Sequence, residues 1–162
     1  MLRRMNKTTL LAAIVAAGAL SGIAARPVAA TPPQGFTSVN IVGPSLLDEI
    51  HTKSETDDHI RIKSKDFTDV YVTEITIVPG GHGGWHSHPA PSIITVKSGA
   101  ATFYDECNDY IRQSFPAGTG FVEDAGCVHL LSNEGDVDLK VIVVQIVPFG
   151  APRRIDEPDP GL

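Results

Sequence analysis

Histidines provide the strongest sign of chemistry in this 162-residue sequence. Three of its six histidines lie close together at His82, His86 and His88, beside a run of glycines. In extended backbone, residues two apart point to the same face, with Cα atoms about 6.5–7 Å apart. The rings of His86 and His88 can therefore bind one ion, at about 2.0–2.1 Å per nitrogen. Two solvated or hydrogen-bonded surface histidines are the alternative interpretation of this pair taken alone.

The histidine pair belongs to a first group of spaced residues, and a second group of spaced residues follows it in the sequence. The two groups comprise Gly80, His86, His88 and Gly99, then Gly118, Gly126, His129 and Asn133. This arrangement resembles the two motifs of the cupin superfamily, over roughly residues 67–147. The resemblance implies a small jelly-roll barrel in which His86, His88 and His129 bind a divalent metal ion. It does not distinguish among iron, manganese, zinc, nickel and copper.

The sequence departs from the cupin motifs at one chemically important position. The glutamate of the first motif falls at Ser92, or at Ile93 with the longer spacing, and neither is a carboxylate. We therefore expect a site of three neutral imidazoles, with weaker metal binding and at least one open coordination position. Water, dioxygen or a chelating substrate would occupy that position. The departure argues against activities that use the motif's carboxylate as a base.

Four further residues are candidates for contacts with a substrate or with the metal ligands. His82 lies in the glycine-rich loop at the expected mouth of the barrel, and Tyr104 lies on the strand after Gly99. Ser92 could fill space or hydrogen-bond to a metal-bound water. Gln145 alternates with Val and Ile on the last expected strand and could face the interior. A solvated loop histidine, a core tyrosine and an edge glutamine are the structural alternatives.

The two cysteines, Cys107 and Cys127, have two interpretations. An even number of cysteines favours a disulfide in an exported chain, and the N-terminal residues described below predict export. It would close a loop of about 20 residues and stabilise the fold by about 3 kcal/mol. Alternatively, Cys127 points the same way as His129 and approaches the metal, which would favour zinc or copper.

Short strand-like segments separated by turns predict the fold class. β-Branched and polar residues alternate, and Gly, Pro, Asn and Asp interrupt them about every 8–12 residues. This pattern is typical of an antiparallel sandwich or barrel. With the two motifs, it predicts an all-β fold with a single antiparallel jelly-roll (cupin) β-barrel over residues 67–147. The expected strands are Val70–Val78, Ile93–Lys97, Ala101–Tyr104, Tyr110–Phe115, Gly120–Glu123, Val128–Ser132 and Leu139–Val147.

The segments on either side of the barrel have signatures of their own. Residues 31–66 are expected to form an N-terminal extension and edge strand, including a helical turn from Ser45 to Ile50 with Ser45 as its cap. Residues 148–162 carry four prolines. This composition predicts a Pro-rich strap that lies extended over the outside of the barrel.

The first thirty residues have the layout of a bacterial signal peptide. Arg3, Arg4 and Lys7 precede an apolar run at Leu10–Leu20, and small residues follow at 28–30. We therefore predict a secreted or periplasmic protein. Cleavage removes four basic residues and no acidic ones, so the net charge changes from −6 to −10. Such a chain repels polyphosphate, which excludes nucleic acid as its main partner.

The expected partners are few, and three functions agree with these observations. We expect a small-molecule ligand, no membrane contact after cleavage, and edge strands available for a homodimer. The first function is an exported cupin that binds a divalent metal and a small molecule, with dioxygenase-type or metal-assisted lyase/isomerase activity. The second is a non-catalytic cupin that binds a small ligand at a degenerate metal site. The third is a structural domain in which the histidines are relics.

Overall fold

The computed structural model describes residues 29–55 and 60–161. The predicted signal peptide, residues 1–30, therefore lies outside the described residues except for its last two positions. In the described part of the chain, no helix is long and apolar enough to cross a membrane.

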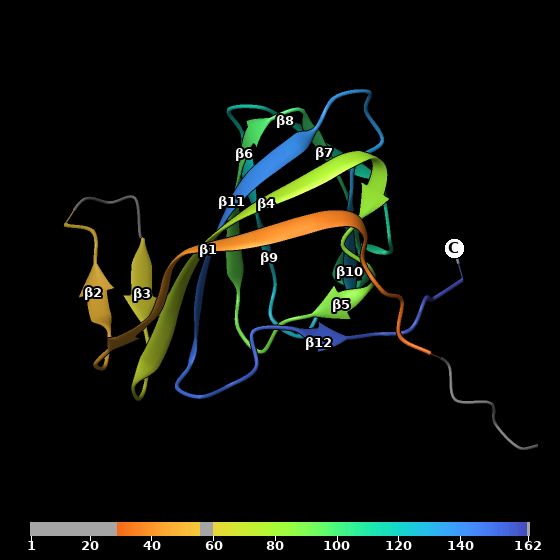
Figure 1. The fold of residues 1–162 in the computed structure, drawn as a ribbon. Coiled ribbons are helices and arrows are strands. Elements are labelled where there is room, and N and C mark those ends of the chain that lie inside the picture. Colours follow the sequence, from red (N-terminus) through yellow and green to blue (C-terminus); the bar gives the residue numbers. More distant parts are fainter. Residues whose placement is uncertain (1–28, 56–59, 162) are drawn as a thin grey trace, which may run out of the picture.

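The described residues form strands joined by short turns, with a single 3-10 helix, η1, at Glu106–Asn108 (Figure 1). The strands are β1 (Gln34–Leu47), β2 (His51–Lys53), β3 (Arg61–Lys63), β4 (Thr68–His82), β5 (His86–Ser87), β6 (Ser92–Ser98), β7 (Ala100–Asp105), β8 (Gln113–Pro116), β9 (Gly120–Glu123), β10 (His129–Ser132), β11 (Leu139–Pro148) and β12 (Ile155–Asp156).

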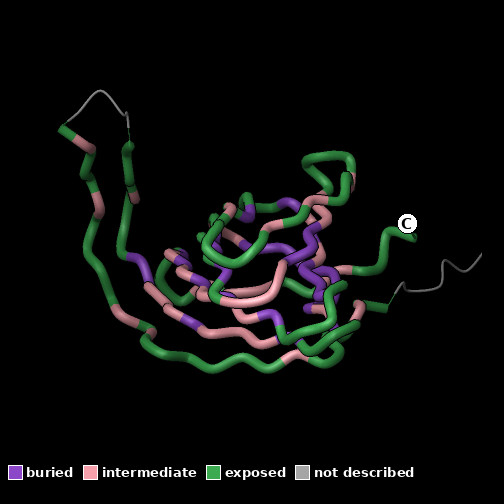
Figure 2. The backbone as a smooth tube through the Cα atoms, turned by 90° about the horizontal axis from the view of Figure 1, so that it is seen from above, coloured by how far each residue is buried: buried purple, intermediate pink, exposed green. Residues whose placement is uncertain are grey.

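Ten of these strands belong to one antiparallel sheet that curls into a barrel. Its central path runs β12, β5, β10, β4, β11, β6, β9; β1 joins β4, and β7 joins β10 and β8. Strands β2 and β3 form a separate hairpin that projects away from the barrel, as the view from above shows (Figure 2). This architecture confirms the predicted all-β jelly-roll fold.

The interior of the barrel has an apolar part and a polar end. On β11, alternate side chains from Leu139 to Val147 point inward, as the period of two in a strand requires. The apolar core combines β11 residues with others from β4, β6, β7 and β10. At one end of the barrel, inward positions become polar in a row across three paired strands, where Gln145 lies opposite Ser92 and Ser92 lies opposite Glu123.

Two local predictions from the sequence are wrong. The helical turn expected from Ser45 is instead the end of β1, which pairs with β4 from Gln34 to Leu47. Backbone hydrogen bonds along this long neighbour outweigh the local capping signal. The strand expected from Tyr110 begins at Gln113, because Asp109 and Tyr110 both have positive φ angles in the turn after η1.

The C-terminal segment returns to the polar end of the barrel. Its strand β12 pairs with β5, with Ile155 opposite Ser87 and Asp156 opposite His86. The side chain of Ser87 also donates a hydrogen bond of 2.9 Å to Glu157. Residues 155–157 therefore hold the short strand that begins with His86.

Candidate metal centre

Three histidines gather at the polar end of the barrel. His86 begins β5, His88 follows that strand, and His129 begins β10, which pairs with β5 so that His129 lies opposite His86. One nitrogen from each ring lies within 4.8 Å of the corresponding nitrogens of the other two. All three side chains are buried. The structure thus brings together the three residues that the motifs single out, in a group that could hold a metal ion.

Backbone carbonyls fix the orientation of each ring. The Nδ1 atom of every histidine lies within hydrogen-bonding distance of a carbonyl oxygen, and because a carbonyl only accepts, Nδ1 carries the proton and donates it. This arrangement directs the lone pair of a neutral ring to Nε2, the atom left for a metal. The three pairs are His86 with Gly84 at 2.8 Å, His88 with Arg153 at 2.7 Å and His129 with Cys127 at 2.9 Å.

The environment of two of the rings favours their neutral form. Burial, with smaller effects from His129, Arg154 and His88, lowers the pKa of His86 to about 2. Burial also lowers the pKa of His129 below its ordinary value. The Nε2 atom of His129 is buried and has no hydrogen-bond partner among the described residues. A neutral imidazole with an unsatisfied buried nitrogen is a suitable metal ligand.

A carboxylate joins the histidines, contrary to the expectation of a site of neutral imidazoles only. Glu123, 3% exposed, places Oε2 3.1 Å from Nε2 of His88 and Oε1 3.7 Å from Nε2 of His129. It comes from the end of β9, directly opposite Ser92 on β6. Residues opposite each other in an antiparallel pair share a face, with Cβ atoms about 4.5–5.5 Å apart. The carboxylate therefore enters from the strand beside the motif's glutamate position.

The contact between Glu123 and His88 needs a positive charge. Because Nδ1 of His88 already carries a proton, Nε2 of the neutral ring presents a lone pair to the carboxylate oxygen. Two such atoms at 3.1 Å repel unless a proton or a cation lies between them. The donor set of three imidazole nitrogens and one carboxylate fits a divalent transition metal.

Two further candidates, Ser92 and Gln145, lie beside this centre. The amide nitrogen of Gln145 donates to the hydroxyl of Ser92 at 3.2 Å, and its oxygen accepts from Nε of Arg153 at 2.9 Å. Both side chains are buried. Gln145 faces the interior, the first of the two orientations considered for it.

His82 and Tyr104 lie apart from the three histidines. Nδ1 of His82 accepts a hydrogen bond from the backbone of Gly84 at 3.1 Å. The hydroxyl of Tyr104 donates to Glu134 at 2.7 Å, and this bond raises the pKa of Tyr104 above its ordinary value. Both residues line a different depression from the one beside the histidines.

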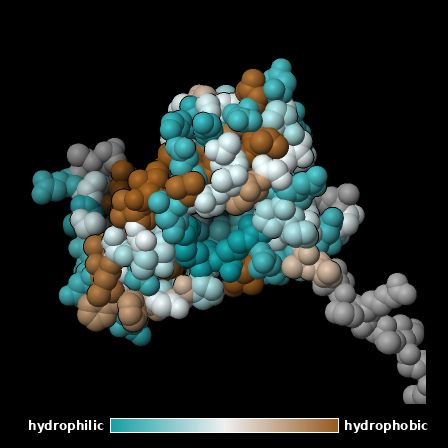
Figure 3. Space-filling model, in the orientation of Figure 1, coloured by the Kyte–Doolittle hydropathy of each residue, from teal (hydrophilic) through white to brown (hydrophobic). Residues whose placement is uncertain are grey.

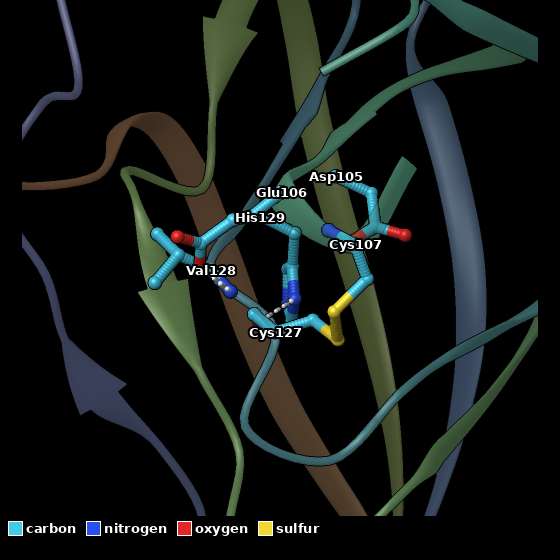
Figure 4. Close-up of a disulfide and its surroundings, with 6 residues drawn as sticks. All are labelled: Asp105, Glu106, Cys107, Cys127, Val128 and His129. Atoms are coloured by element: carbon cyan, nitrogen blue, oxygen red, sulfur yellow. Dashed lines mark hydrogen bonds between the residues drawn. A yellow bond between two sulfur atoms is a disulfide. The ribbon is translucent and has the colours of Figure 1, made fainter. Parts of the chain in front are cut away.

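A disulfide joins Cys107 and Cys127, whose Cα atoms lie 5.7 Å apart (Figure 4). The sulfur of Cys127 is therefore not available as a ligand. Its backbone carbonyl accepts the hydrogen bond from His129, so this cysteine orients the histidine through its main chain. The bridge ties the turn that precedes His129 to η1.

A cavity of about 320 Å³ opens beside the histidines. On the face shown in Figure 3, the surface is hollowed below β1, and hydrophilic residues gather in the hollow. Two arginines of the C-terminal segment reach this cavity, and the sequence offered no local sign of them because they are some 65 residues from His88. The lining comprises Pro33, Phe36, Ser38, Ile75, Gly83, His86, His88, Glu123, Leu131, Val143, Gln145, Arg153 and Arg154.

Comparison with known proteins places the barrel in a family. Residues 73–145 match the family model of the cupin domain. A chain from the crystal structures of the DMSP lyases RdDddP and RnDddQII is similar at a TM-score of 0.52 and 19% identity, covering 75% of this chain and 52% of that one. No curated protein sequence matches the chain.

Two further solved structures are similar at lower TM-scores. A conserved protein of unknown function from Streptococcus pyogenes has a TM-score of 0.49 at 20% identity, covering 72% of this chain and 76% of that chain. A predicted oxalate decarboxylase from Thermotoga maritima has a TM-score of 0.42 at 21% identity, covering 51% and 82% respectively.

Proposed function

Because this chain belongs to the cupin superfamily, we propose that it binds a divalent metal ion and acts on a small organic molecule in the adjoining cavity. His86, His88 and His129 would hold the ion through Nε2, with Glu123 as the carboxylate ligand. The observation that carries the proposal is the orientation of the rings. Three separate backbone carbonyls accept a hydrogen bond from Nδ1, which leaves Nε2 of each ring free, and one nitrogen from each ring lies within 4.8 Å of those of the other two.

The donor set suits several divalent metals and singles out none. Imidazole nitrogen and carboxylate oxygen suit iron, manganese, nickel, zinc and copper, whereas the soft ligand that would single out zinc or copper is absent, since the sulfur of Cys127 is in a disulfide. A bound ion would act as a Lewis acid that polarises an oxygen atom of the bound molecule.

The residues around the ion support a lyase or isomerase type of reaction. Apolar walls from Phe36, Ile75, Leu131 and Val143 would exclude water from a bound molecule. Glu123 is the only carboxylate among the described residues that line the cavity, and it would hold the ion through one oxygen and leave the other free. A carboxylate in this position can accept a proton from the bound molecule, as proton abstraction requires.

The disulfide also supports our proposal that the protein is exported. Disulfides form and persist in secreted and periplasmic proteins and are rare in the reducing cytosol. The bridge between Cys107 and Cys127 would be stable in the compartment to which a signal peptide directs a chain.

Metal content tests the central claim. Purified protein is incubated separately with Mn²⁺, Fe²⁺, Ni²⁺, Zn²⁺ and Cu²⁺, dialysed, and analysed for its elements. We expect one ion per chain with at least one metal, and background levels in the double variant His86→Ala/His88→Ala. The matched control is His51→Ala, because His51 is exposed on β2, outside the barrel. Folded wild-type protein that retains none of the five metals would overturn the proposal.

A further inference from the structure

Two consecutive arginines of the C-terminal segment line the cavity, and they have different surroundings. Each nitrogen of the Arg153 guanidinium donates one hydrogen bond. Its Nε donates to Gln145 at 2.9 Å, Nη1 to Asn40 at 2.8 Å and Nη2 to Thr73 at 2.6 Å, and the group lies over the ring of Tyr71 at 4.3 Å. Arg153 therefore fixes the C-terminal segment to the barrel, with each of its three guanidinium nitrogens already in one hydrogen bond.

Arg154 retains an unused donor at the same cavity. Its Nε pairs with Asp156, but Nη2 is buried and has no hydrogen-bond partner among the described residues. The side chain is 26% exposed, which places it at the mouth of the cavity and not in the core. The side chain lines the same cavity as His86 and His88. A buried guanidinium nitrogen without a partner is costly unless a ligand satisfies it.

The charges of the cavity favour an anion. Apart from the histidines, the lining carries two guanidinium groups and one carboxylate, Glu123, which leaves one positive charge. The chain as a whole has a net charge of −6, so the cavity has the opposite sign to the protein. Most other lining side chains are apolar, including Phe36, Ile75 and Leu131. An organic anion with a short apolar part matches both features.

We propose that Arg154 binds the carboxylate group of the substrate, so that the substrate class is a small organic carboxylate. The assignment of a substrate rests on the proposed function, whereas anion binding by Arg154 does not require the metal. Guanidinium groups and carboxylates form charge-assisted hydrogen bonds that are about twice as strong as neutral ones.

A carboxylate fits this site better than a phosphate. Nη2 of Arg154 is the one buried guanidinium nitrogen without a partner among the described residues, and every nitrogen of Arg153 already donates one hydrogen bond, so the site offers few buried donors. A phosphate carries about twice the charge and three strong acceptor oxygens. Glu123 in the same cavity would repel that second charge.

Calorimetric titration with matched probes tests the proposal. Butyrate is compared with butyramide, its neutral isostere, and with inorganic phosphate, using metal-free and Mn²⁺-loaded protein. We expect wild-type protein to bind butyrate at least about tenfold more tightly than either other probe. Arg154→Gln should lose that preference. Arg112→Gln is the matched control, because Arg112 pairs with Glu134 on the surface away from the cavity.

The variant Arg154→Lys separates loss of charge from loss of fold. It should keep part of the preference for butyrate, and circular dichroism of all variants checks that they are folded. The proposal is overturned if wild-type protein binds butyrate no better than butyramide, if it prefers phosphate, or if folded Arg154→Gln binds butyrate as wild type does. Elemental analysis tests the proposed metal binding, and titration of the metal-free protein tests anion binding by Arg154. Either claim can therefore fail while the other holds.

Discussion

At the scale of single residues, Glu123 decides the character of the centre. Its two oxygens face Nε2 of His88 and Nε2 of His129 at 3.1 and 3.7 Å. A buried carboxylate so placed lowers the net charge of a bound dication and adds an oxygen ligand to three nitrogens. A metal ion bound here would supply the positive charge that the contact between Nε2 of His88 and this carboxylate needs.

The substitution Glu123→Gln tests this role, because it keeps the size of the side chain and removes its charge. We expect metal affinity to fall by about tenfold or more, since changes in groups around a metal cost about 10–100-fold. Competition with a chromophoric chelator measures the affinity. The control is Glu74→Gln, whose carboxylate pairs with Lys97 away from the cavity. Equal affinities for Glu123→Gln and wild type would exclude Glu123 as a ligand.

Sequence reasoning could identify the histidines but not this carboxylate. His86, His88 and His129 belong to motifs with regular spacing, so local patterns reveal them. Glu123 reaches the site only because β9 pairs with β6 in a register that sets it opposite Ser92. One available signal was the alternation on the predicted strand Gly120–Glu123, which places Glu123 on the same face as Phe121.

At the scale of elements, the turn between β4 and β5 positions a ligand through its backbone. The carbonyl of Gly84 accepts the hydrogen bond from Nδ1 of His86. Gly84 has a φ of +71°, and a Cβ there would collide with the backbone oxygen of Thr31. The N-terminal segment thus packs against the turn so closely that only glycine fits. The orientation of His86 depends on that packing.

Two glycine substitutions separate the collision from the backbone strain. Gly118 has a similar φ of +85°, but a Cβ there would meet nothing within 4 Å. Gly118→Ala should therefore cost only the left-handed conformation, about 1–2 kcal/mol of unfolding free energy. Gly84→Ala should cost more and should also weaken metal binding. Urea unfolding of the metal-free proteins measures the stabilities, and similar losses in the two variants would contradict this account of the turn.

The strands themselves were largely predictable, but the contacts of the end segments were not. Five of the expected strands agree closely with observed ones. The sequence alternates along these strands, and burial alternates with it, as on β11 and β6. The β12–β5 pairing joins residues some 70 positions apart, and no local pattern encodes it. The same is true of the hydrogen bond from His88 to the carbonyl of Arg153.

At the scale of the whole molecule, the centre depends on segments that are distant in the chain. β5 is held by β12 on one side and by β10 on the other, and the disulfide ties the start of β10 to η1. Several independent attachments keep three rings aligned in a site that no single element contains. Loss of one attachment should therefore affect both the stability of the barrel and the geometry of the centre.

The double variant Cys107→Ala/Cys127→Ala tests the covalent attachment. The bridge spans 20 residues, so its loss should lower the unfolding free energy by about 3 kcal/mol through the added entropy of the unfolded chain. Urea unfolding with a chelator present measures this loss without any contribution from bound metal. Because Cys127 also holds Nδ1 of His129 through its carbonyl, a main-chain shift there would turn Nε2 away from the other ligands.

Metal affinity of the same variant distinguishes a purely stabilising bridge from one that also aligns the site. If the bridge positions His129, the folded variant should bind metal at least about tenfold more weakly, as for other changes around a metal. Unchanged affinity together with reduced stability would limit the bridge to the fold. Unchanged stability would contradict the stabilising role, since closing a loop of this length must restrict the unfolded chain unless strain in the native state cancels the gain.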